Sequence, residues 1–120
     1  DYLPHVVGKS AERIAEQDYL DRGYTSIARN FRCRGGEIDL LLFRDGELVL
    51  VEVKARRQLC LDDAWLARWY RKKSRLSRAL TWFLAVHPEW AARAEEYRLE
   101  IVFITQGRVS ERYTEEPYCG

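Results

Sequence analysis

The sequence lacks the features of a membrane-spanning or exported protein. It has no long uncharged apolar run and no signal-peptide pattern, which a membrane helix or a secretory precursor would need. Its three cysteines, Cys33, Cys60 and Cys119, are odd in number and widely spaced, so they predict neither a disulfide framework nor a zinc site. We therefore expect a cytoplasmic protein with no membrane partner. Methionine is absent, so we expect an initiator residue ahead of Asp1, and the sequence excludes nothing about upstream targeting.

The sequence also has few histidines and a small net charge. His5 and His87 have no partner at the spacing of metal ligands or catalytic pairs, so both are interpreted as structural. The formal net charge is +1, which is too small for a protein that binds polyanions with its whole surface. Any binding to nucleic acid would have to come from a local basic patch.

The composition that is present is typical of one globular domain. The chain has 120 residues, of which 47% are hydrophobic and 32% are charged. That is enough apolar material for a single core. We expect one domain over residues 1–120, with a core at about 8–105 and a polar tail at 106–120 that is left unassigned.

The strongest local pattern is a hairpin in the middle of the chain. Two runs rich in Leu, Val, Ile and Phe flank Asp45-Gly46, a dipeptide that tolerates the positive φ angles of a two-residue type I′ turn. With that loop, Arg44 faces Glu47. Alternation then puts Leu41, Phe43, Leu48 and Leu50 on one face and Ile38, Leu40, Leu42, Val49, Val51 and Val53 on the other. Because both faces are apolar, we expect the hairpin inside a sheet.

The same register gathers charged residues at one end of the hairpin. It places Asp39 opposite Glu52 and Glu37 opposite Lys54, all on one face. Carboxylates about 5 Å apart repel by roughly 3 kcal/mol at an effective dielectric of about 20. A Mg²⁺ or Mn²⁺ ion shared by Asp39 and Glu52 would offset that repulsion. The alternative is a solvated end at which these carboxylates pair with Lys54 or a nearby arginine, and a one-residue register slip would separate them.

The remaining patterns predict helices and strands around this hairpin. We expect a helix from Lys9 to Leu20, a half-buried strand from Tyr24 to Arg32, and a long helix from Asp63 to Val86. His87-Pro88-Glu89 breaks that helix and starts a short one, and Tyr97 to Thr105 reads as a further strand. The chain is therefore expected to be α/β, with an αβββαβ core and a central mixed sheet flanked by helices.

Basic residues concentrate after the hairpin and in the long helix. Local contacts to phosphates would come from Arg56, Arg57, Lys72, Lys73 and Arg75. The alternative for the helical residues is an ordinary solvated face.

Several motifs together resemble a known family. Asp39 followed by Glu52-Val53-Lys54 is similar to the PD-(D/E)XK nuclease pattern, without its literal Pro-Asp. The longer set resembles the YraN-like family of small bacterial proteins, which is related to archaeal Holliday junction resolvases. That set runs from about Gly8 to Ile104 and comprises Gly8, Ala11-Glu12, Asn30-Phe31-Arg32, Gly36-Glu37-Ile38-Asp39-Leu40, Val51-Glu52-Val53-Lys54-Ala55-Arg56, Lys73 and Arg75-Leu76.

The sequence also departs from this family at two places. Glu100 stands where relatives tend to have aspartate, and the stretch at Cys60-Leu61 lacks an expected glycine. The resemblance therefore assigns no role to Glu100 and does not predict the shape of the loop at Cys60-Leu61.

The resemblance implies a restriction-endonuclease-like fold and assigns roles to residues. Asp39, Glu52 and the backbone carbonyl of Val53 would bind Mg²⁺ or Mn²⁺, and Lys54 would orient or activate the attacking water. Glu12 would reach the metal directly or through water, although a carboxylate in a first helical turn also gains from the helix dipole. Glu37 would support Lys54 or bind a second cation; a plain cross-strand ion pair is its alternative.

The function that the resemblance implies is metal-dependent hydrolysis of phosphodiester bonds. The expected substrate is nucleic acid, DNA before RNA, including branched or repair intermediates. A homodimer or a protein partner is compatible with that activity. The alternatives are a non-catalytic nucleic-acid-binding module of the same fold, acting with a partner, and a structural adaptor that keeps a vestigial site.

Overall fold

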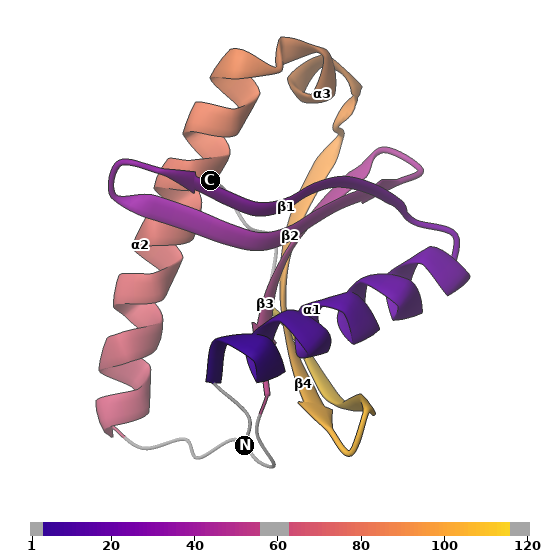
Figure 1. The fold of residues 1–120 in the computed structure, drawn as a ribbon. Coiled ribbons are helices and arrows are strands. Elements are labelled where there is room, and N and C mark those ends of the chain that lie inside the picture. The colour runs from indigo at the N-terminus through magenta and orange to yellow at the C-terminus, as the bar shows by residue number, and fades with distance from the viewer. Residues whose placement is uncertain (1–3, 56–62, 116–120) are drawn as a thin grey trace.

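The computed structural model describes residues 4–55 and 63–115, which form three helices and five strands (Figure 1). The elements follow in the order α1 (Pro4–Asp21), β1 (Thr25–Cys33), β2 (Gly36–Arg44), β3 (Glu47–Lys54), α2 (Asp63–Val86), α3 (Pro88–Arg93), β4 (Glu96–Thr105) and β5 (Arg108–Glu115). The αβββαβ order is confirmed, and so is the short helix after His87. Strand β5 is an addition within the tail that the sequence left unassigned. None of the described helices is long and apolar enough to cross a membrane.

The five strands form one mixed sheet in the order β1-β2-β3-β4-β5. Strands β3 and β4 run parallel, joined by a crossover through α2 and α3, and the other neighbours are antiparallel. A mixed sheet flanked by helices is compatible with the restriction-endonuclease-like fold.

Helices α1 and α2 cover opposite faces of the sheet (Figure 1). The alternation expected for the hairpin is confirmed, with one exception: Ile38 packs on the α2 side rather than with Leu40. The sheet residues packed under α2 are Ile38, Leu41, Phe43, Leu48, Leu50, Leu99, Ile101 and Phe103. Those packed under α1 are Leu40, Leu42, Val49, Val51, Val102 and Ile104.

The β2–β3 and β4–β5 hairpins each turn through two residues with positive φ. Asp45 and Gly46 have φ angles of 49° and 81°, and Arg44 pairs with Glu47. This confirms the expected turn and register. Gln106 and Gly107, with φ angles of 52° and 75°, make a second such turn between β4 and β5.

Strands β2 and β3 separate at one end, and this separation positions the candidate site. Their pairing runs from Arg44–Glu47 to Leu40–Val51. Beyond that point β3 continues beside β4, while the β1–β2 hairpin bends across α2 (Figure 1). At Gly36 the approach is so close that a Cβ atom would lie 2.5 Å from the carbonyl oxygen of Arg75. A glycine is therefore required where the hairpin meets the helix backbone.

Candidate active site

Asp39 lies at the point where β2 and β3 separate. Its Oδ2 atom accepts a hydrogen bond from the backbone N–H of Val53, with a donor–acceptor distance of 2.9 Å. The side chain therefore reaches across the gap and satisfies a donor of β3. This bond fixes the carboxylate beside the last residues of β3.

Glu52 is the most enclosed carboxylate of the site, with 3% of its surface exposed. Its Oε2 lies 3.1 Å from Nζ of Lys54, and its Oε1 lies 3.4 Å from Nζ of Lys72. Among the described residues, Oε1 has no hydrogen-bond donor. Its polar contact is therefore the ion pair with Lys72, whereas most buried polar atoms also have a hydrogen-bond partner.

Glu37 does not face Lys54 as the register predicted. Its Oε1 accepts from Lys72 at 3.0 Å and from Arg75 at 3.4 Å, and Arg32 lies 4.0 Å from its other oxygen. The expected pairing with Lys54 was wrong because the β2–β3 ladder ends before it reaches Glu37. The bend of β2 toward α2 places Glu37 beside helical cations instead.

The electrostatics of the site differ from one carboxylate to the next. Burial and the negative charge of Glu52 raise the pKa of Asp39 to about 7, against the opposing Val53 N–H bond and Lys72. The hydrogen bond from Lys72 lowers the pKa of Glu37 despite partial burial. Burial disfavours the charge on Lys72, but Glu52 and Glu37 outweigh it and raise its pKa. Asp39 and Glu52 thus repel each other, while Glu37 is well compensated.

These donors fit a hard divalent cation. Two carboxylates beside the Val53 backbone offer oxygen ligands. Oε1 of Glu52 accepts no hydrogen bond among the described residues and already faces one cation, the Lys72 ammonium at 3.4 Å. Among the side chains that the structure describes, no group of three from Asp, Glu, His or Cys gathers around one point. A small ligand set is usual for Mg²⁺, which often binds through one or two carboxylates and completes its shell with water and substrate phosphate.

Glu12 lies on α1, which covers the opposite face of the sheet from α2. It lines an open groove of about 750 Å³ between α1 and β1, together with Glu16 and Arg29. Its role toward a metal, direct or through water, stays a prediction.

Comparison with known proteins gives the family. The model of uncharacterised protein family UPF0102 matches residues 11–104. The chain belongs to this family. UPF0102 is the YraN family whose motifs the sequence resembles, and the matched residues span nearly the whole stretch that carries those motifs.

Several bacterial UPF0102 proteins are similar over most of their length. The protein from Kineococcus radiotolerans is 40% identical over 101 residues, covering 83% of this chain and 80% of its own. The protein from Halorhodospira halophila is 42% identical over 88 residues, which is 73% of each chain. The protein from Rhodopseudomonas palustris is 45% identical over 98 residues, covering 81% of this chain and 72% of its own.

The predicted phosphate-binding residues of this UPF0102 chain have different surroundings. Lys72 lies within the carboxylate cluster, as described above. Lys73 pairs with Glu115 of β5 at 3.1 Å. Arg75 contacts Glu37 but keeps 52% of its side chain exposed. Arg56 and Arg57 lie outside the described residues.

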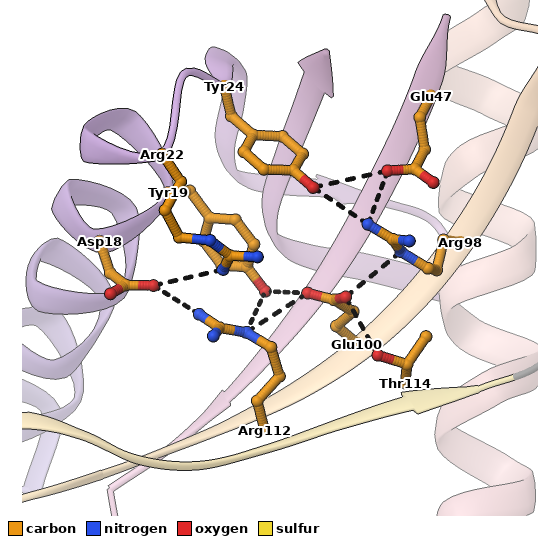
Figure 2. A network of polar contacts seen from close by, with 9 residues as sticks. All are labelled: Asp18, Tyr19, Arg22, Tyr24, Glu47, Arg98, Glu100, Arg112 and Thr114. Carbon is orange, nitrogen blue, oxygen red and sulfur yellow. Dashed lines mark hydrogen bonds and ion pairs between the residues drawn. The ribbon is translucent and has the colours of Figure 1, made fainter. Parts of the chain in front are cut away.

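A second polar cluster, which sequence reasoning missed, lies under α1 on the other side of the sheet (Figure 2). At its centre is Glu100, which is 3% exposed. The Tyr19 hydroxyl donates to one carboxylate oxygen, and Thr114 donates to the other at 3.1 Å. Two arginines, Arg98 and Arg112, lie 3.2 and 3.5 Å from the same carboxylate.

This cluster ties α1 to three strands. Asp18 of α1 accepts from Arg112 of β5, and Glu47 of β3 accepts from Arg98 of β4 at 2.6 Å (Figure 2). Burial and the Glu100 carboxylate raise the pKa of Tyr19, which keeps its hydroxyl protonated as a donor. We interpret the cluster as structural, because its acidic and basic groups are paired. A glutamate in the middle of an apolar strand was the available signal in the sequence.

Proposed function

We propose that this UPF0102 protein is a metal-dependent endonuclease that hydrolyses phosphodiester bonds of nucleic acid, DNA before RNA. One observation carries the proposal: Asp39 and the buried Glu52 converge where β2 and β3 separate, next to Lys54. Burial, and after it the negative charge of Glu52, raise the pKa of Asp39 to about 7. A site that holds two mutually repelling carboxylates is suited to a cation.

In this proposal the residues have separate roles. Asp39, Glu52 and the Val53 carbonyl would hold Mg²⁺ or Mn²⁺. Such an ion, when bound, supplies Lewis acidity at a phosphoryl oxygen and lowers the pKa of a bound water. Lys54 is anchored 3.1 Å from Glu52 with 33% of its side chain exposed, so its ammonium can reach a phosphate oxygen or orient the attacking water.

The ordinary alternative for these carboxylates is a structural ion-pair network. Such a network explains Glu37, which has three cationic neighbours. It does not explain Asp39, because no lysine or arginine of the described residues forms an ion pair with it. It accounts for Glu52 in part, because Oε1 forms an ion pair with Lys72 but has no hydrogen-bond donor among the described residues.

A second function, nucleic-acid binding without cleavage, is favoured by one feature. Lys54 and Lys72 both lie close to Glu52 and offset part of its charge without a metal. A protein of this kind would hold branched or damaged nucleic acid for a partner.

The test is cleavage of end-labelled single-stranded, duplex and branched DNA, and of single-stranded RNA, with Mg²⁺, Mn²⁺ or EDTA. We expect metal-dependent products that disappear in Asp39→Asn, Glu52→Gln and Lys54→Met. Glu96→Gln is the matched control, since Glu96 is exposed and lies at the other end of the parallel β3–β4 pair. Salt-sensitive binding without cleavage on any of these substrates would replace the nuclease with the binding module.

A further inference from the structure

One face of α2 carries a continuous stripe of exposed basic and aromatic residues. Arg71, Arg75, Arg78 and Trp82 follow one another at spacings of four, three and four residues, so they lie along one side of the helix. All four are exposed, and Trp82 keeps 55% of its surface accessible. The helix has no acidic residue after Asp63. We call these four residues the α2 ridge.

The β1–β2 hairpin carries two more arginines at its end next to α2. Arg34 lies in the turn that follows β1, and Arg32 lies at the end of that strand. The turn touches the ridge: a Cβ atom on Gly35 would lie 3.4 Å from Nη1 of Arg78. The Arg78 guanidinium therefore lies against this turn, and Arg32 and Arg75 contact the same Glu37 carboxylate.

This surface has an excess of positive charge although the whole chain is nearly neutral. Its acidic member is Glu37, which already contacts Arg32, Arg75 and Lys72. In the part of the chain that the structure describes, no carboxylate pairs with Arg34, Arg71 or Arg78. Unpaired guanidinium groups next to an exposed indole are the features that hold a nucleic-acid backbone and stack its bases.

We propose that the α2 ridge binds a single-stranded segment of nucleic acid, with its arginines on phosphates and Trp82 stacked on an unpaired base. The choice of a single strand follows from Trp82, because a base within a duplex does not offer a free face for stacking. From Arg71 to Trp82 the ridge is about 16 Å long, at 1.5 Å per residue. It therefore holds a short run of nucleotides.

The ridge leads into the candidate active site. Arg75 contacts Glu37, and Lys72, next to Arg71 in the chain, contacts both Glu37 and Glu52. Trp82 is about 15 Å from Lys72 along the helix axis. This inference deepens the proposed function and rests on it: the substrate would carry an unpaired segment, such as a flap or a junction, and the cut would fall a few nucleotides from the stacked base.

The test measures binding in EDTA, so that it does not depend on cleavage. Fluorescence anisotropy compares a fluorescein-labelled 20-nucleotide DNA with the matching duplex. We expect Trp82→Ala to weaken binding of the single strand about tenfold or more, with little effect on the duplex, and Trp82→Phe to restore most of it. Arg71→Ala/Arg78→Ala should weaken both and reduce the salt slope by about two.

Two controls keep the test specific. Tyr70→Ala removes an exposed aromatic residue on a different side of α2, and Arg108→Ala removes an exposed arginine at the β4–β5 turn. Wild-type affinity in the ridge variants, equal losses in the controls, or a preference for anionic phosphatidylglycerol vesicles over the single strand would each overturn the proposal. Ridge-dependent binding without metal-dependent cleavage would sustain this inference while the nuclease proposal fails.

Discussion

Lys72 is expected to hold the carboxylate cluster together in the absence of metal. Its Nζ lies 3.0 Å from Glu37 and 3.4 Å from Glu52, and 21% of its side chain is exposed. At an effective dielectric of about 20, each contact is worth about 5 kcal/mol in gross Coulomb energy. The cost of burying Lys72 offsets much of this. Lys72→Met keeps the apolar stem but leaves Glu52 facing Asp39, and should lower the free energy of unfolding by roughly 3 kcal/mol.

A double-mutant cycle separates this pair from the rest of the network. Urea unfolding at pH 8 and low salt would compare Lys72→Met, Glu52→Gln and the double variant, with a coupling energy of about 2 kcal/mol or more expected. The Lys73–Glu115 pair gives the matched cycle. Its lysine lies on the same helix and its distance is 3.1 Å, but 34% of the Glu115 side chain is exposed, against 4% of the Glu52 side chain. Its coupling should stay below about 1 kcal/mol. Equal coupling in the two cycles would refute the reasoning.

Three further changes have predictable effects on stability. The pKa of Asp39 is raised from 3.8 to about 7, so between these pH values the folded state holds a proton that the unfolded state has lost. The free energy of unfolding should therefore fall as pH rises across that window. A wild-type pH profile parallel to that of Asp39→Asn would count against this prediction. Tyr19→Phe removes a hydrogen-bond donor to the buried Glu100 carboxylate and should lower the free energy of unfolding, measured in urea, by about 1–3 kcal/mol. An unchanged free energy of unfolding would mean that the cluster in Figure 2 does not stabilise the fold. Gly36→Ala forces a methyl group against Arg75 and Ala79 and should lower stability by about 1–3 kcal/mol; an unchanged thermal midpoint would show that the hairpin can move off the helix.

The hairpin and its turn were predictable because they depend on local chemistry. Asp45 and Gly46 favour positive φ angles, and this fixes Arg44 opposite Glu47 and the faces of most residues along both strands. The long helix and the strand from Glu96 to Thr105 follow from hydrophobic periodicity in the same way. The proximity of Asp39 and Glu52 was a consequence of that register.

The contacts that the sequence did not predict are those made between distant elements. The ladder ends at Leu40–Val51 because the hairpin bends toward α2 at Gly36, and periodicity does not report such a bend. As a result, Glu37 forms an ion pair with Lys72 instead of Lys54. The pairing of Glu100 with residues of α1 and β5 is equally non-local, since Tyr19 is 81 positions away in the chain.

The central claim is that Asp39 and Glu52 form one metal site, and calorimetric titration with Mn²⁺ tests it most directly. Wild type, Asp39→Asn, Glu52→Gln and the control Glu96→Gln would be titrated at pH 8, where Asp39 is largely ionised, given its pKa of about 7. The account predicts saturable binding in wild type and control that is lost in both site variants. Absence of binding, or binding indifferent to both changes, would contradict it and leave the hairpin as a core element alone.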